Sequence, residues 1–296
     1  MNWFQAQGQT RQGILLLIAA MAVLGGMDAI AKALTQELPP IQVVWARYTS
    51  QTLVVFLIFA PRLGRLMKTN HLRLQIIRSA FLFGATFCFF TGLSKMGLGE
   101  AVALFEINPL VVSIGAFVFL KEPLGIRRLL AVSLGLVGAL VVVRPGGGLF
   151  TPAAVFPVLA ACSYAGYVLS TRFLGRDENI LTSLIYTTLF GAVISSFLVW
   201  PIWIPPSNQA IGLMCVMGVI GTIGQWFLIR AFTVAEAGAI APFSYIGLVF
   251  ALIIGLVFWG EWPDAMTLFG ASIIVCAGVY VWYRERRLAA DPVLHD

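Results

Sequence analysis

The sequence has few charged residues and little of the chemistry from which enzyme or metal sites are built. Only 11% of its 296 residues are charged, and it holds two histidines and four cysteines. His71 and His295 lie outside the long apolar stretches, and no two cysteines have C-x-x-C spacing, so we expect no metal and no cofactor. The sequence has no nucleophile elbow, phosphate-binding loop or zinc-ligand pair, which argues against an enzyme.

The remaining residues are mostly apolar. Hydrophobic residues make up 59% of the chain, and the mean hydropathy is +0.92. Apolar stretches of about twenty residues recur, which is the length that an α-helix needs to cross a bilayer. The alternating stretches of about ten residues that are typical of a membrane barrel are not the pattern. We therefore expect an all-α integral membrane protein surrounded by lipid. The net charge of +6 comes from basic residues that cluster in the links between spans. Such clusters mark the orientation of the spans in the membrane, so we expect no nucleic acid partner.

Hydropathy and length indicate about ten transmembrane helices. The expected spans are 14–34, 43–60, 74–93, 99–120, 126–143, 153–173, 181–200, 210–232, 237–258 and 265–283. Most of the links between them are short and punctuated by proline and glycine, and they leave no room for a soluble domain.

Lysine and arginine are unevenly distributed over the two sides of these spans. If the N-terminus is cytoplasmic, fifteen of the 19 basic residues, Arg78 among them, fall on the inner side. The outer side receives Lys32, Arg47, Lys95 and Arg144. Because positively charged loops are retained in the cytoplasm, we expect both termini to be inside.

Two copies of one unit follow each other along the chain. The segments V-F-L-K-E-P and V-F-W-G-E-W-P place Glu122 and Glu261 at an offset of 139, and the same offset carries Glu106 onto Tyr245. Five spans per copy invert the second copy, which in transporters places the substrate site near the midplane between the halves. The expected units are 1–148 and 149–288, each a five-helix repeat, followed by a cytoplasmic tail at 289–296.

The most informative polar residues lie within the fourth expected span. Glu106, Asn108 and Pro109 share one turn there. An ionised carboxylate near the centre of a bilayer costs roughly 2.5 to 3.5 kcal/mol, so Glu106 should face protein or a water-filled cavity. Pro109 cannot donate to the carbonyl of Phe105, so a kink is expected. Intramembrane ionisable groups usually line pathways, and the alternative is a hydrogen bond between helices.

Three further charged residues lie near the outer ends of the first two spans. Asp28 precedes Lys32 by four residues, the favourable order for an ion pair on one helix. Such a pair is either part of a transport pathway or anchored at the membrane interface. For Arg47 three roles remain open: neutralising Glu106, binding a substrate carboxylate, or anchoring at lipid headgroups.

Aromatic and polar side chains recur at helical spacing in the second half of the chain. They indicate either ordinary packing or the lining of an amphipathic cavity. Together with the fourth span, the expected substrate-binding residues are Thr86, Glu106, Asn108, Tyr164, Tyr167, Gln225, Trp226, Ser244 and Tyr245. The expected hinge positions are Pro109, Gly115 and Pro242, although Pro242 also suits an ordinary helix start and glycines suit close packing.

The repeated pattern, the E-P-type ends of the fourth and ninth spans and the run Gly-Ala-Leu-Val-Val-Val at 138–143 resemble the EamA branch of the drug/metabolite transporter superfamily. Within it the chain looks most like the YddG-type aromatic amino acid exporters, which it matches at Pro109, Tyr164, Trp226 and the Ser244-Tyr245 pair. The resemblance implies two inverted five-helix repeats. It also implies a central cavity lined by the third, fourth, eighth and ninth helices with parts of the first and sixth.

These observations together predict a secondary transporter in the bacterial inner membrane, a monomer or a dimer, that exports aromatic or neutral amino acids or similar small metabolites by alternating access. Proton coupling through Glu106 and facilitated diffusion fit equally well. The alternatives are an exporter of drugs or nucleotide-like metabolites, a membrane-embedded lipid enzyme and a channel.

Overall fold

The computed structural model describes residues 3–120, 126–143, 152–174, 178–234 and 241–290, and these contain helices and no strand. The first half holds α1 (Trp3–Leu34), α2 (Pro40–Phe59), η1 (Ala60–Arg62), α3 (Leu63–Leu66), α4 (Leu72–Leu93), α5 (Leu98–Phe105), α6 (Asn108–Leu120) and α7 (Ile126–Val143). The second half holds η2 (Pro152–Ala154), α8 (Val155–Leu174), α9 (Ile180–Val199), η3 (Trp200–Ile202), α10 (Asn208–Val234), η4 (Ala241–Tyr245), α12 (Ile246–Trp259) and α13 (Ala265–Ala290).

Local signals explain several of the helix boundaries. Pro40 occupies the first turn of α2, where its missing N–H costs no hydrogen bond. Asn179 caps α9, because its side-chain oxygen accepts a hydrogen bond from the backbone N–H of Leu181 at 2.9 Å. Gly260 ends α12 in the left-handed region with φ 63°, a conformation that favours glycine.

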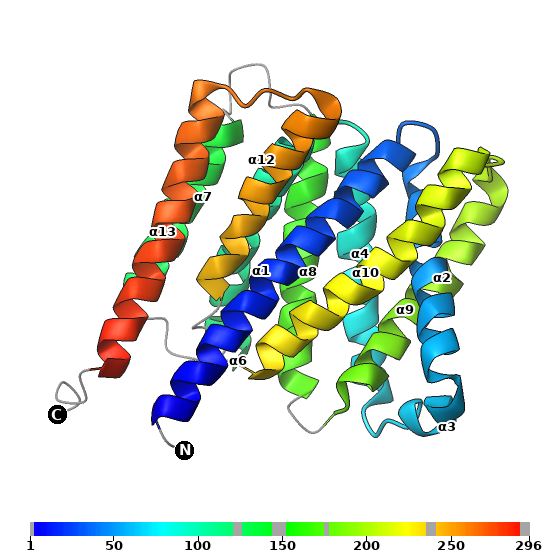
Figure 1. The fold of residues 1–296 in the computed structure, drawn as a ribbon, viewed down its shortest axis with the longest axis horizontal. Coiled ribbons are helices and arrows are strands. Elements are labelled where there is room, and N and C mark those ends of the chain that lie inside the picture. Colours follow the sequence, from blue (N-terminus) through cyan, green and yellow to red (C-terminus); the bar gives the residue numbers. More distant parts are fainter. Residues whose placement is uncertain (1–2, 121–125, 144–151, 175–177, 235–240, 291–296) are drawn as a thin grey trace.

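Every expected span overlaps a helix or a pair of helical segments in the described part of the chain. Six helical stretches are long and apolar enough to cross a membrane by length and composition, and α12 and α13 contain shorter apolar segments. The all-helical membrane class predicted from the sequence is therefore confirmed. The number of crossings and the N-in orientation stay predictions, and Figure 1 shows α1 beginning and α13 ending on the same side of the molecule.

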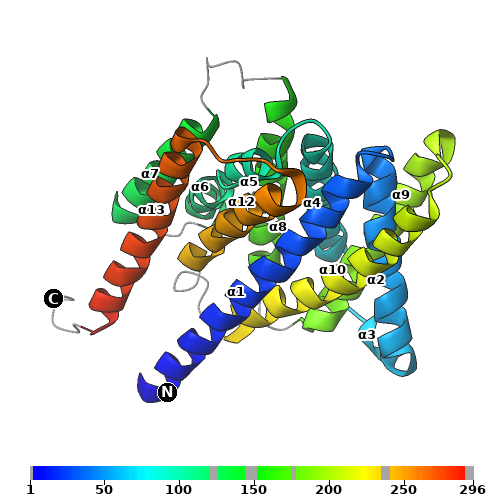
Figure 2. The same ribbon diagram turned by 45° about the horizontal axis from the view of Figure 1, so that its top comes forward.

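Helices that are distant in the sequence pack in pairs. In Figures 1 and 2, α7 and α13 lie together at one edge, α2 and α9 at the other, and α1 and α10 cross in front of α4 and α8. At an offset of 139 or 140 residues, α1 corresponds to α8, α2 to α9, α4 to α10 and α7 to α13. The α1–α10 pair therefore corresponds to the α4–α8 pair, and the α2–α9 and α7–α13 pairs each correspond to themselves. This is the contact pattern that a pseudo-twofold relation between two repeats produces.

Candidate functional site

The fourth expected span is broken at Glu106. α5 ends at Phe105, Glu106 and Ile107 form a turn, and α6 begins at Asn108. The side-chain amide of Asn108 donates to the carbonyl of Phe105 at 3.1 Å, which is the acceptor that Pro109 cannot serve. The predicted kink is confirmed, and the hydrogen bond from Asn108 stabilises it.

At the equivalent position of the second half a 3₁₀ segment passes directly into an α-helix, with no turn between them. The short η4 segment ends at Tyr245, and α12 begins at Ile246. These positions correspond to Glu106 and Ile107 at the offset of 139 that the sequence shows. Discontinuous helices are a feature on which secondary transporters build their substrate sites, and the first half provides one at Glu106.

Glu106 lies buried at the break between α5 and α6. Its residue is 9% exposed, and its Oε2 atom has no hydrogen-bond partner among the described residues. The ring of Phe105, the residue before Glu106, packs on that of Tyr164, and the carboxylate acts electrostatically on the hydroxyl groups of Tyr164 and Tyr245. A buried carboxylate oxygen without a donor costs free energy that only a ligand, a water or a proton offsets.

Aromatic rings form a continuous series beside Glu106. The ring centroids of Phe89 and Phe105 are 5.3 Å apart, those of Phe105 and Tyr164 are 5.3 Å apart, and those of Tyr164 and Tyr167 are 5.6 Å apart. These spacings suit edge-to-face and tilted packing of the rings. The predicted aromatic stripe of α8 therefore lies at the broken helix, where its rings provide an apolar wall.

Arg78 continues this series at its far end. Its guanidinium carbon lies 4.5 Å from the ring centroid of Tyr167, and Nη2 donates to the Tyr167 hydroxyl at 2.8 Å. Further donations reach the hydroxyl groups of Thr171 and Thr187 at 2.7 and 2.9 Å and the carbonyl of Ser183 at 3.2 Å. The sequence placed Arg78 on the inner side as a topology signal. The structure buries Arg78, which is 2% exposed on α4, so it belongs to the packed bundle and not to a link; its side of the membrane stays a prediction.

Arg47 is the second buried arginine. Its Nη1 donates to the hydroxyl of Thr86 at 3.2 Å, and the same hydroxyl lies 2.9 Å from that of Tyr48. The guanidinium carbon lies 5.6 Å from the ring centroid of Phe90. The residue is 8% exposed, which excludes the headgroup anchor. Within the described residues Arg47 forms no ion pair with Glu106.

The two arginines line one small cavity between α2, α4, α9 and α10. It has room for about one water molecule. The other lining residues are Tyr48, Gln51, Leu82, Leu184, Thr187, Thr188, Gln225 and Ile229. Gln225, which the sequence predicted as a binding residue, therefore faces this cavity.

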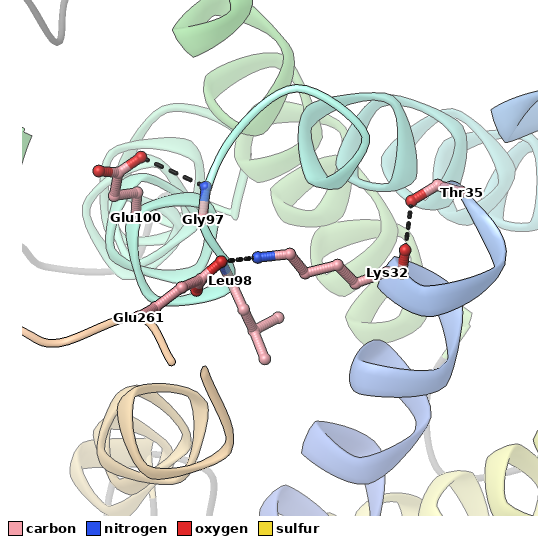
Figure 3. Close-up of polar contacts among 6 residues, drawn as sticks. All are labelled: Lys32, Thr35, Gly97, Leu98, Glu100 and Glu261. Atoms are coloured by element: carbon pink, nitrogen blue, oxygen red, sulfur yellow. Dashed lines mark hydrogen bonds and ion pairs between the residues drawn. The ribbon is translucent and has the colours of Figure 1, made fainter. Parts of the chain in front are cut away.

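A third polar cluster joins three segments at the opposite side of the molecule from the start of α1 (Figure 3). The ammonium of Lys32 pairs with the carboxylate of Glu261, whose second oxygen accepts a hydrogen bond from the N–H of Leu98 at 3.1 Å. The left-handed turn at Gly260 orients Glu261 toward the start of α5. The expected pair of Asp28 with Lys32 is thus wrong, because a partner 229 residues away occupies the ammonium.

This cluster gives a prediction for stability. Replacing Glu261 by Gln is expected to destabilise the protein by about 2 kcal/mol, because Lys32, with a side chain only 5% exposed, loses its partner. The double variant Lys32→Met with Glu261→Gln should recover most of that loss, since no buried charge is left alone. Thermal unfolding of the purified protein in detergent measures both. Equal losses in the single and double variants would mean that the pair is not coupled.

The remaining expected site residues differ in their burial and in their positions on the helices. Trp226 is 46% exposed on the surface of α10, so the structure does not bring it to the cavity. Ser244 is half-buried in η4. Gly115 is buried against α8, and an added Cβ there would lie 2.4 Å from Leu169 Cδ1, which indicates a packing role beside any hinge role. Pro109 and Pro242 occupy the starts of α6 and η4.

An α-helical, apolar bundle of two related halves, with one helix broken at Glu106 and buried charged groups in its interior, has the architecture of a membrane transporter. The chain belongs to the EamA-like transporter family, which it matches at residues 11–144 and 151–283. The two matched ranges correspond to the two halves.

Several characterised proteins are similar over nearly the whole chain. An S-adenosylmethionine uptake transporter of Rickettsia conorii is 28% identical over 93% of this chain and 94% of its own. The pseudopaline exporter CntI of Pseudomonas aeruginosa is 29% identical over 90% of this chain and 94% of its own. A riboflavin transporter of Vibrio cholerae is 26% identical over 94% of this chain and 97% of its own.

One solved crystal structure has a TM-score of 0.72 against this chain, with 93% of this chain and 98% of the other covered at 18% identity. At that identity the likeness shows the fold alone. The family and the membrane-transporter class predicted from the sequence are confirmed. None of the three relatives is named for an aromatic amino acid, so the closer likeness to aromatic amino acid exporters is not supported.

Proposed function

We propose that the protein is a secondary transporter of the inner membrane that exports amino acids or small metabolites carrying an amino acid group, by alternating access. The observation that carries the proposal is Glu106: a buried carboxylate with an unpartnered oxygen at the break between α5 and α6. An ammonium group is the cation that would offset this carboxylate, and Tyr164 and Tyr245 provide hydroxyl groups beside it.

The relatives support a substrate of this kind. The name of the Rickettsia conorii protein contains methionine, whose amino and carboxylate groups S-adenosylmethionine retains. The aromatic series from Phe89 to Tyr167 adds an apolar wall for a side chain or a planar ring. Direction of transport differs among the named relatives, which include an uptake transporter and an exporter. Export therefore remains part of the proposal.

A second candidate is a carrier of nucleotide-like or flavin-like metabolites. The series of aromatic rings at Phe105, Tyr164 and Tyr167 favours it, because planar heterocycles pack well against aromatic side chains. The relatives named for S-adenosylmethionine and riboflavin are in line with such a substrate. In that case Glu106 would bind an amino group of the metabolite.

Uptake of radiolabelled substrates into proteoliposomes tests the proposal. Phenylalanine, tryptophan, threonine, methionine and alanine form the first panel, with S-adenosylmethionine and riboflavin as the second. We expect saturable uptake of at least one amino acid, reduced by unlabelled competitors, without an imposed ion gradient. Uptake confined to the second panel would replace amino acids by the second candidate, and linear, non-saturating flux would indicate a channel.

A further inference from the structure

Two buried arginines share a cavity, and neither forms an ion pair with an acid in the part of the chain that the structure describes. We propose that Arg47 and Arg78 bind the carboxylate of the transported substrate, in the cavity between α2, α4, α9 and α10. The inference rests on the proposed function, because it names the second group by which an amino acid substrate is recognised. Under this proposal the substrate is a zwitterion whose ammonium and carboxylate are each bound by groups of opposite charge.

The charge balance of the cavity carries the argument. Arg47 and Arg78 are 8% and 2% exposed, and within the described residues neither forms an ion pair. The carboxylate of Asp28 acts electrostatically on Arg47 without forming an ion pair with it, and Asp28 does not line the cavity. Two like charges that are buried together with no paired anion are costly, so an anionic group that enters the cavity gains strongly.

The two guanidinium groups differ in how fully they are used. Arg78 donates to four neutral acceptors and is held firmly in place. Among the described residues Arg47 donates only to Thr86, at 3.2 Å, and its buried Nε has no partner there. A guanidinium has five N–H donors, and a carboxylate accepts two of them side by side. Arg47 therefore supplies the direct contact, and Arg78 adds fixed positive charge.

The rest of the cavity suits one end of a small polar molecule. Gln51, Gln225, Thr187 and Thr188 line it with amide and hydroxyl groups. The room for about one water molecule is too small for a carboxylate. The carboxylate thus enters only when α2 and α4 part from α9 and α10, a movement between the two halves that alternating access requires.

The cavity is joined to the broken helix through two tyrosines. Arg78 contacts Tyr167, whose ring packs on that of Tyr164. The charges of both Arg78 and Glu106 act on the Tyr164 hydroxyl. A substrate between these groups would place its ammonium at Glu106 and its carboxylate at the arginines. Opposite charges at the two ends would also select for zwitterions against simple amines.

Competition against the amino acid taken up best in proteoliposomes tests the inference, with the free amino acid and its neutral amide as competitors. For Arg47→Gln we expect the amino acid concentration that gives half-maximal competition to rise about tenfold, which corresponds to the loss of one charge-assisted contact. The concentration of the amide that gives half-maximal competition should change less than twofold. Arg47→Lys should fall between, because it keeps the charge and loses the planar fork. Arg65→Gln, an exposed residue of α3, is the control and should match wild type.

The failure of this inference is distinguishable from failure of the proposed function. If wild type takes up amino acids but the amide competes as well as the acid, the function stands and the carboxylate site does not. A second measurement needs no transport: succinate should raise the thermal unfolding temperature of wild-type protein above that in chloride at equal ionic strength. Arg47→Gln should abolish this difference. An equal effect of both salts on wild type would overturn the site.

Discussion

Glu106→Gln is expected to lower substrate transport about a hundredfold and at the same time to stabilise the purified protein. The Oε2 atom of Glu106 is buried without a partner, and a neutral amide is cheaper to bury than a carboxylate. Transport falls because the substrate ammonium would lose its buried counter-charge. Truncating one partner of a comparable buried charge pair costs about 2 to 5 kcal/mol or more, and a hundredfold change in affinity corresponds to about 2.8 kcal/mol.

The sign of the stability change separates a functional from a structural role. A Glu106→Met variant leaves no polar atom behind and should be the most stable of the series, by about 1 to 3 kcal/mol over wild type. Thermal unfolding and proteoliposome uptake, measured on the same preparations, give both quantities. Arg65→Gln, an exposed residue of α3, serves as the control. If Glu106→Gln is less stable than wild type, the carboxylate acts as a structural hydrogen-bond acceptor between helices.

The same variant examines proton coupling. A carboxylate that carries a proton across the membrane makes the uptake rate depend on pH, and its amide has no such dependence. Uptake by Glu106→Gln with an unchanged rate and an unchanged pH profile would exclude coupling through this residue and also a role in substrate binding.

Gly191→Ala is expected to destabilise the protein by about 3 kcal/mol, because the added methyl group has no room. Gly191 lies on α9 against the ring of Tyr48 on α2, and an added Cβ would stand 2.4 Å from the Tyr48 Cγ atom. The ring cannot move aside cheaply, because Tyr48 is 1% exposed and its hydroxyl lies within hydrogen-bond distance of Thr86 and of the carbonyl of Leu82. Overpacking of this kind forces the helices apart.

Gly26→Ala is the matched control for this prediction. Gly26 is also helical, in α1, but nothing lies within 4 Å of an added Cβ. Alanine is the better helix former by about 1 kcal/mol in water, so this variant should be as stable as wild type or more stable. The comparison is made by thermal unfolding in one detergent. Equal stability of the two variants would show that α2 and α9 are farther apart than the structure places them.

The sequence by itself determined the membrane class, the repeat and the position of the break. Long apolar runs require helices in a bilayer, because only internally hydrogen-bonded segments satisfy their backbone there. Pro109 removes a hydrogen bond at a known position, so the break at Glu106 follows from local chemistry. The offset of 139 then identified Tyr245 as the counterpart of Glu106, and the structure places the start of α12 directly after it.

Only the tertiary structure decided which polar groups meet. Lys32 pairs with Glu261 instead of Asp28, Arg78 lies inside the bundle instead of in a link, and Trp226 faces outward while Gln225 faces the cavity. Spacing along a helix fixes which side chains share a face. The rotation of that face toward one neighbour or another depends on the packing of all the helices together, and that packing sets the partner of every buried charge.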